Sequence, residues 1–163
     1  MPDLTSLAAS VGALLKASGQ NVAVSESSCG GLISAALVAV PGASAYYLGG
    51  GVVYTTVSRQ GILQLPAEAF ANMRASTEPY AVRNARTIRT LLGATWGLSE
   101  TGASGPAGNR YGDAAGHACM AVSGPVERSM TLETGQSDRE ANMWTFARTA
   151  LQLLEACLRA SQK

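Results

Sequence analysis

The organisation of the chain is set by residues 21–40, which read NVAVSESSCGGLISAALVAV. The first five residues are rich in β-branched valine and predict a short strand. The next six, from Glu26 to Gly31, are small, polar and glycine-rich, and an apolar run typical of a buried helix follows as far as residue 40. A strand that passes through a glycine turn into a helix is the repeating unit of an α/β sheet.

The same alternation continues on both sides of this stretch. Apolar spacing and capping signals predict helices over 4–15, 32–40, 56–63, 67–73, 78–92 and 138–159. Valine-rich, alanine-rich and aromatic runs predict further strands over 52–54, 94–98, 118–122 and 126–132, with a glycine-rich loop over 101–115. We therefore expect one domain over 1–163, a three-layer α/β/α sandwich with a mostly parallel sheet and an antiparallel edge hairpin.

Composition excludes several classes of function. The 163 residues include 12 basic and 11 acidic side chains, so the formal net charge is +1. This balance and an aromatic content of 6% do not indicate a nucleic-acid partner. No apolar run has the length of a membrane span, and the first residues lack the basic start of a secretory signal. The interpretation is a cytoplasmic protein without a membrane or nucleic-acid partner.

Residues that are scarce also limit the chemistry. The three cysteines are widely spaced and typical of reduced thiols, and the one histidine, His117, cannot by itself build a zinc site. Lys16 and Lys163 are the only lysines. We expect no metal and no cofactor, and a site that depends on hydroxyls, arginines, carboxylates and backbone amides.

Three loops carry most of the small polar residues. The first, 26–31, has glycines that let backbone amides approach an anion, but its spacing is equally typical of a tight turn with capping serines. The second contains Ser44, with Tyr54 ten residues later; in isolation Ser44 is more typical of a helix cap than of a nucleophile. The third, 101–108, is a glycine-rich segment after a buried strand, and Arg139 at the start of the last helix has the geometry to bind phosphate or carboxylate.

Taken together, these segments resemble one known family. VSESSCGGLI at 24–33 resembles the AESCTGG segment of the CinA C-terminal domain family, the nicotinamide mononucleotide (NMN) deamidases also called PncC. PGAS at 41–44, GVVYT at 51–55, STEP at 76–79, TGASGPAG at 101–108 and DR at 138–139 resemble that family's other motifs in the same order. The resemblance extends from about residue 5 to residue 160.

The resemblance implies an α/β domain that hydrolyses the carboxamide of NMN to nicotinate mononucleotide and ammonia without a metal. It implies that Ser44 is the catalytic serine, with Tyr54 and the residue at 59 beside it. The substrate-binding residues that it implies are Glu26, Ser27, Ser28, Gly30, Gly31, Thr101, Gly102 and Arg139. It also implies a homodimer or a higher homo-oligomer.

The sequence departs from the family pattern at three positions, Arg59, Cys29 and Ala43, the last of which replaces the first serine of the family's PGSS segment. Arg59 stands where the family has a lysine, and arginine stays protonated, so Arg59 can stabilise an oxyanion but does not act as a base. Tyr54, or Glu26 through a water molecule, then has to accept the proton. Cys29 stands where the family has threonine; it is either a packing residue or an alternative nucleophile before a helix N-terminus.

Two hypotheses about function follow. In the first, the chain is an amidohydrolase in which Ser44 attacks the carboxamide of NMN. In the second, it is an impaired family member that binds a pyridine nucleotide or a protein partner without turnover. Arg59 separates the two hypotheses, and ammonia release from NMN is the measurement that distinguishes them.

Overall fold

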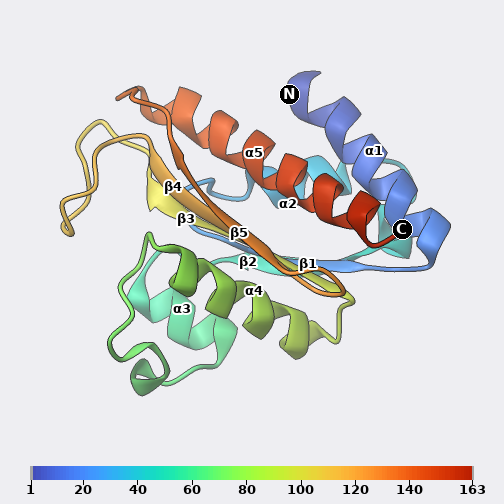
Figure 1. Ribbon diagram of the computed structural model, residues 1–163, viewed down its shortest axis with the longest axis horizontal. Coiled ribbons are helices and arrows are strands. Elements are labelled where there is room, and N and C mark those ends of the chain that lie inside the picture. The colour runs from blue at the N-terminus through green and yellow to red at the C-terminus, as the bar shows by residue number, and fades with distance from the viewer. Residues whose placement is uncertain (1, 163) are drawn as a thin grey trace.

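The computed structural model describes residues 2–162 and contains a five-stranded sheet between two layers of helices (Figure 1). Its elements, in chain order, are α1 (Pro2–Ser18), β1 (Val22–Glu26), α2 (Leu32–Val38), the 3₁₀ helix η1 (Ala43–Ala45), β2 (Tyr47–Val52), α3 (Thr56–Leu63), the 3₁₀ helix η2 (Ala67–Phe70), α4 (Glu78–Leu92), β3 (Trp96–Ala103), β4 (His117–Ser123), β5 (Arg128–Glu133) and α5 (Arg139–Ala160).

The strand order is β2-β1-β3-β4-β5. β1 is parallel to both of its neighbours, with Val22 opposite Tyr47 of β2 and Trp96 of β3. β4 runs antiparallel to β3 and to β5, so the last two strands form the edge hairpin that the sequence predicts. The α/β sandwich is therefore confirmed, with a mixed sheet in which two strand pairings are parallel and two antiparallel.

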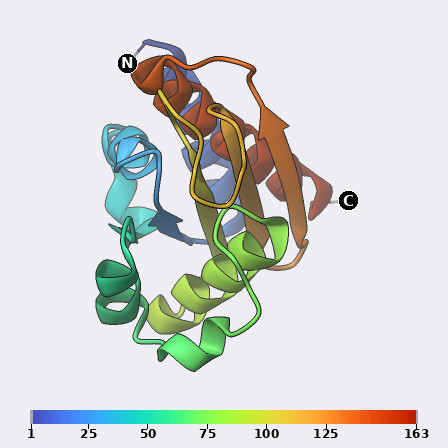
Figure 2. The same ribbon diagram turned by 90° about the vertical axis from the view of Figure 1, so that its left-hand side faces the viewer.

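The helices divide between the two faces of the sheet. α1, α2 and α5 cover one face, and α3 and α4 cover the other, as both views show (Figure 1, Figure 2). The larger core lies between the sheet and the first group, and it includes the fully buried Trp96, Tyr46 and Phe146. A smaller core lies under α3 and α4 and includes Phe70 and Tyr80, whose ring centroids are 5.4 Å apart.

Side-chain caps fix where three helices begin. The Thr55 hydroxyl accepts a hydrogen bond from the backbone N–H of Ser58 and caps α3, one residue before Thr56, the cap that the sequence predicts. Thr77 and Asp138 cap α4 and α5 in the same way. These caps satisfy amides that have no partner within the helix, so a local sequence signal is enough to place each helix start.

β2 lies earlier in the chain than the sequence predicts. The prediction of a strand over 52–54 is wrong, because the observed strand β2 ends at Val52 and contains all three residues of the glycine triplet 49–51. A β-carbon at Gly50 would clash with the carbonyl oxygen of Val24 in β1, and one at Gly51 would lie 2.6 Å from the side chain of Ile62 in α3. The glycines therefore allow close packing inside the sheet instead of forming a turn before it.

Other boundaries differ by smaller amounts. β3 continues through Thr101 and Gly102, which the sequence assigns to a loop. The helix predicted over 32–40 ends at Val38, and the segment 67–73 forms only the short helix η2. Among the helices of residues 2–162, none has the length and apolar character needed to cross a bilayer.

Candidate ligand-binding site

The carboxyl ends of β1, β2 and β3 meet at one edge of the sheet and surround a cavity of about 520 Å³. The chain leaves β1 toward one face of the sheet and enters β3 from the other, and such a reversal is where open α/β sheets bind ligands. The volume is in the range of small-molecule sites. We call this space the strand-end cavity. It is lined by Ser27, Val53, Tyr54, Thr55, Thr56, Arg59, Ala75, Ser76, Tyr80, Thr101, Gly102, Asn109, Arg110 and Tyr111.

Five of the predicted site residues line this cavity together. Ser27 follows β1, Tyr54 follows β2, Arg59 projects from α3, and Thr101 and Gly102 lie near the end of β3. Their convergence depends on the parallel register, which puts Glu26 opposite Val52 and so brings the ends of β1 and β2 level. The sequence places these residues in separate segments of the chain, and the sheet brings them to one edge.

Ser44 lies away from this group within the chain. It is an exposed residue of η1, before the start of β2, whereas Tyr54 follows the end of that strand. β2 separates them by about 17 Å at the usual rise of a strand, and Ser44 is not among the residues that line the strand-end cavity. The prediction that Ser44 shares a pocket with Tyr54 and Arg59 of the same chain is therefore wrong, because the glycines between them form a strand and not a turn.

Glu26 binds the backbone of the loop that follows it. Its buried carboxylate accepts hydrogen bonds from the backbone N–H groups of Gly31 at 3.0 Å, Ile33 at 3.0 Å and Ser34 at 2.8 Å, and from the Ser34 hydroxyl at 2.5 Å. The anion at the N-terminus of α2 is thus the protein's own carboxylate. Glu26 has a structural role here, and it leaves Tyr54 as the remaining candidate for accepting a proton.

Glu100 in β3 completes the support of the same loop. Its buried carboxylate accepts hydrogen bonds from the backbone N–H groups of Ser27 at 3.1 Å and Cys29 at 2.9 Å, and from the Ser28 hydroxyl. Burial raises the pKa of Glu100, while these donors oppose the shift. The loop 26–31 therefore matches the tight-turn interpretation more closely than an open anion-binding loop, and Ser28, Gly30 and Gly31 do not line the strand-end cavity. Sequence reasoning missed Glu100, although a carboxylate within a buried strand is a signal for such a role.

Cys29 is a packing residue. Its side chain is completely buried, and burial raises the pKa of the thiol well above its ordinary value. The neighbouring carboxylates of Glu100 and Glu26 raise that pKa further. A thiol that stays protonated is a poor nucleophile, so the alternative that gives Cys29 a catalytic role is not supported.

Arg59 lies across two aromatic rings at the wall of the cavity. Its guanidinium carbon is 4.2 Å from the centroid of Phe70, and Nη1 donates a hydrogen bond of 3.2 Å to the Tyr80 hydroxyl. Within residues 2–162, its buried Nε has no hydrogen-bond partner and its charge has no carboxylate within ion-pair distance. Arg59 is therefore held in place by packing, with charge available for an anionic ligand.

Arg139 joins the start of α5 to the exit of β2. Nη1 donates a hydrogen bond of 2.6 Å to the carbonyl oxygen of Gly105, and Nη2 donates one of 2.9 Å to the Tyr54 hydroxyl. Because the phenolic oxygen accepts this bond, the Tyr54 proton remains free to be donated elsewhere. Arg139 thus holds the Tyr54 ring at the rim of the cavity.

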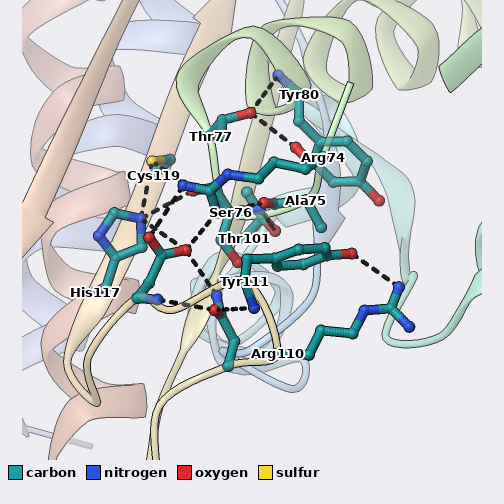
Figure 3. A network of polar contacts seen from close by, with 12 residues as sticks. Arg74, Ala75, Ser76, Thr77, Tyr80, Thr101, Arg110, Tyr111, His117 and Cys119 are labelled. Atoms are coloured by element: carbon teal, nitrogen blue, oxygen red, sulfur yellow. Dashed lines mark hydrogen bonds and ion pairs between the residues drawn. The ribbon is translucent and has the colours of Figure 1, made fainter. Parts of the chain in front are cut away.

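The loop 105–116 forms the other wall, and a polar network holds it against the segment before α4 (Figure 3). Arg74 donates two hydrogen bonds to the carboxylate of Asp113, at 2.5 and 3.1 Å, and Asn109 donates one to the same carboxylate at 2.8 Å. The bonds from Arg74, with smaller contributions from Asn109 and His117, lower the pKa of Asp113 to about 2. Asp113 therefore remains ionised and keeps the loop closed over the cavity at neutral pH.

His117 is part of this network and does not line the cavity. Its Nδ1 pairs with the Glu133 carboxylate, and its Nε2 lies 2.9 Å from the carbonyl oxygen of Ser76. Burial by itself lowers the pKa of His117, but Glu133, the Ser76 carbonyl and Asp113 together raise it. The backbone N–H of Ser76 in turn donates to the Thr101 hydroxyl at 3.2 Å, so His117 supports a residue of the cavity wall.

The charges at the cavity are unbalanced. Within the described part of the chain, its lining includes Arg59 and Arg110 and no carboxylate. Arg110 donates a hydrogen bond of 2.8 Å to the Tyr111 hydroxyl, and its guanidinium carbon is 5.0 Å from the centroid of that ring. Tyrosines 54, 80 and 111 add aromatic faces to the same walls. Uncompensated arginines beside aromatic rings match a ligand with an anionic group and a planar ring.

The fold and this site define an α/β domain with a nucleotide-sized cavity at the carboxyl ends of its parallel strands. The sequence model of the CinA C-terminal domain matches residues 4–158, and the chain belongs to that family.

Individual relatives agree with this assignment. A CinA-like protein of Parasynechococcus marenigrum is 41% identical over 128 residues, which cover 78% of this chain and 30% of that protein. A CinA-like protein of Anaeromyxobacter dehalogenans is 37% identical over 98% of this chain and 38% of its own length. The chain thus spans about a third of these curated relatives. The crystal structure of a CinA superfamily protein from Klebsiella pneumoniae has a TM-score of 0.89 and 28% identity, and covers 96% of this chain and 98% of its own.

Proposed function

We propose that this chain is an amidohydrolase that binds NMN in the strand-end cavity and hydrolyses its carboxamide. The observation that carries the proposal is the presence of Arg59 and Arg110 in a lining without a carboxylate. NMN has a phosphate monoester, which pairs with guanidinium groups, and a cationic pyridine ring, which is attracted to aromatic faces. The resemblance to the NMN deamidases supports the same ligand.

The reaction follows the chemistry of an activated hydroxyl. Ser44 lies outside the strand-end cavity of its own chain, so in this proposal the serine comes from a second copy in a homo-oligomer. Its hydroxyl adds to the carboxamide carbon, the C–N bond breaks, and ammonia leaves with the serine proton, which Tyr54 relays. Water then adds to the acyl-serine, so that nicotinate mononucleotide is released and the hydroxyl is restored. Tyr54 fits the relay because its oxygen accepts from Arg139 while its own proton is free. Arg110 pairs with the phosphate at the other end of NMN, which leaves the guanidinium of Arg59 to stabilise the oxyanion.

One observation favours a second candidate, which is nucleotide binding without turnover. Ser44 is not at the strand-end cavity of its own chain, and Arg59 stands at the position of the family's lysine. In that case the site retains the ligand contacts and lacks a nucleophile. The two candidates share the same ligand and differ only in chemistry.

Ammonia release from NMN, measured beside calorimetric binding of NMN, tests the proposal. We expect the wild type to bind NMN and to release ammonia, and Ser44→Ala to bind NMN with unchanged affinity and release none. Arg59→Lys should raise the rate, because a desolvated lysine can lose its proton and activate a hydroxyl. Binding without ammonia release supports the second candidate, and the absence of both overturns the proposal.

A further inference from the structure

His117, which does not line the strand-end cavity, has both of its ring nitrogens on oxygen acceptors. Nδ1 pairs with the Glu133 carboxylate, and Nε2 lies 2.9 Å from the carbonyl oxygen of Ser76. A carbonyl oxygen and an ionised carboxylate accept hydrogen bonds and have no proton to donate. A neutral imidazole has a single N–H and would leave one of these acceptors facing a lone pair, whereas the imidazolium donates to both. The geometry therefore selects the charged form of His117.

Two carboxylates from different elements face the ring. Glu133 ends β5, and Asp113 belongs to the loop 105–116, with Oδ2 3.8 Å from Nε2 of His117. Arg74 is the cation beside them, and its guanidinium is bonded to Asp113. Burial by itself lowers the pKa of His117, but the bonds to Glu133 and to the Ser76 carbonyl and the two carboxylate charges raise it above its ordinary value. His117 therefore keeps its charge at pH values where an ordinary histidine has lost it.

Two further titratable groups near the ring do not compete for this proton. Cys119 lies two residues after His117 on the same face of β4, with Sγ 3.7 Å from Nε2, and burial and the neighbouring carboxylates raise the pKa of its thiol. Glu78 at the start of α4 accepts hydrogen bonds from the hydroxyls of Ser129 at 2.5 Å and Thr131 at 2.8 Å, and these bonds lower its pKa. The thiol thus stays neutral and Glu78 stays ionised while His117 titrates.

On one wall of the cavity, the imidazolium holds a strained residue. Ser76 has a φ of 58°, in the left-handed region that residues other than glycine rarely occupy. Its carbonyl oxygen accepts from His117 and its N–H donates to the Thr101 hydroxyl at 3.2 Å, so the residue is fixed at both ends. Ser76 and Thr101 both line the strand-end cavity. The proton on Nε2 therefore keeps a residue of the cavity wall in a conformation that its backbone does not favour by itself.

The same charge acts on the opposite wall of the cavity (Figure 3). Asp113 is bonded to Arg74 and to Asn109, and it faces His117. Its carboxylate fixes the loop 105–116, part of which lines the cavity. The Asp113 side chain is only 14% exposed, so solvent screens its attraction to the imidazolium less than at an open surface. Loss of the His117 charge thus removes one of the two cations that hold this loop.

We propose that His117 is a positioning residue of the strand-end cavity: as an imidazolium it holds Ser76 and Asp113, and through them the segment 74–77 and the loop 105–116, in the arrangement that binds a ligand. When the proton leaves, one ring nitrogen presents a lone pair to an acceptor, and the attraction to Asp113 is lost. The loop then opens more often, although Arg74 still binds it. The effect on the loop is independent of catalysis, and the effect on NMN rests on the proposed function.

Hydrogen exchange tests the loop without a ligand. The protection of the peptide 105–116, taken relative to the intrinsic exchange rate at each pH, should be about threefold higher at about pH 6 than at about pH 9 in the wild type, the scale of one partly exposed ion pair. His117→Gln should have the lower protection at both pH values, because glutamine carries no charge. The peptide 139–160 in α5 reports global stability and should not follow the loop. Equal protection of the loop at both pH values in the wild type, or an unchanged pH dependence in the variant, overturns the inference.

A change at the partner carboxylate tests the same point and keeps the test valid where His117→Gln does not fold. Glu133→Gln removes a charge that raises the pKa of His117, and the Glu133 side chain is 59% exposed, so the variant should fold. We expect the midpoint of the loop's pH dependence to move to lower pH. Glu127→Gln, which removes a carboxylate paired with Arg86 near the other end of β5, should leave the midpoint unchanged. Equal midpoints in the two variants contradict the assignment to His117.

Binding of NMN then separates this inference from the proposed function. Calorimetry gives the affinities of the wild type and of His117→Gln at each pH, and their ratio removes the titration of the NMN phosphate, which is the same for both proteins. We expect the wild type to bind about threefold more tightly at about pH 6 and with nearly equal affinity at about pH 9. Absence of NMN binding at both pH values contradicts the proposed function, and the exchange measurement still decides the inference. A loop that follows the pH while the affinity ratio stays constant contradicts the positioning role.

Discussion

The Tyr54 hydroxyl accepts a hydrogen bond of 2.9 Å from Nη2 of Arg139, and this bond joins the exit of β2 to the start of α5. Two segments that are 85 residues apart in the sequence thus meet at the rim of the strand-end cavity. Arg139 also donates a hydrogen bond to the carbonyl oxygen of Gly105, where the loop 105–116 begins. The guanidinium therefore sets the position of a catalytic candidate and of the loop that faces it.

Replacement of this arginine should reduce binding of NMN. Arg139→Gln keeps much of the side-chain length and removes the charge, and we expect the affinity for NMN to fall by at least roughly tenfold, the scale of one charge-assisted hydrogen bond. Calorimetric titration measures this effect. Arg159→Gln, at an exposed pair with Glu155 near the end of α5, is the matched control and should leave the affinity unchanged. Equal affinities in both variants would remove Arg139 from the site.

Glu26 should stabilise the fold and not take part in the chemistry. Glu26→Ala leaves the backbone N–H groups of three residues without their acceptor, and we expect a loss of about 3 kcal/mol in the free energy of unfolding. For a chain of this length that loss corresponds to roughly 6–12 °C in Tm. Glu68→Ala, at an exposed position of η2, should change the stability by less than about 0.5 kcal/mol. Thermal unfolding of both variants gives the comparison, and a fully stable Glu26→Ala protein would contradict the structural role.

The His117 network should make stability depend on pH. The pKa of His117 is raised in the folded state, so protonation favours folding; this contribution is complete below the ordinary pKa of about 6.5 and is lost as the pH rises through the folded pKa. We expect the wild type to exceed His117→Gln in unfolding free energy by more at about pH 5.5 than at about pH 9. Asp113 titrates near pH 2 and contributes no slope in this range. Urea unfolding at the two pH values measures the difference, and a gap that widens with pH would contradict the assignment.

Two glycines in the same region should respond in opposite directions to alanine. Gly50→Ala forces a methyl group against the carbonyl of Val24, and we expect a loss of roughly 1–3 kcal/mol. Gly61 lies in α3 with nothing within 4 Å of an added β-carbon, so Gly61→Ala should increase stability by about 0.5–1 kcal/mol. Chemical denaturation of the two variants tests the packing of β2. Equal effects would mean that the close contact in β2 is not formed.

These glycines also explain which parts of the structure the sequence could predict. Helix starts were predictable to within one residue because their caps are local: Thr77 and Asp138 are the caps of α4 and α5, and Thr55 caps α3 next to the predicted Thr56. The position of β2 was predicted wrongly because its glycines were interpreted as a turn. They are glycines because Val24 of β1 and Ile62 of α3 leave no room for a β-carbon at Gly50 and Gly51, and these contacts exist only in the folded chain.

The candidate site was also predictable only in part. Tyr54, Arg59 and Thr101 were identified from the family's motifs, and the parallel strands bring them together. Arg110 and Tyr111 carry no motif, and the bond between Arg74 and Asp113 holds the loop that places them at the cavity wall. The wrong prediction for Ser44 has the same cause, because β2 lies between Ser44 and Tyr54 where a turn was expected. A serine and a tyrosine separated by a turn can share a pocket, and the same pair separated by a strand cannot do so within one chain.

The most direct test of the account is a calorimetric titration of NMN into the wild type and into the double variant Arg59→Ala/Arg110→Ala, with the exposed Arg83→Ala on α4 as the control. The account predicts saturable binding to the wild type and to the control, weaker binding of nicotinamide riboside, which lacks the phosphate, and an affinity for NMN at least about tenfold lower in the double variant. Binding of NMN with equal affinity to all three proteins, or no binding to the wild type, would contradict it.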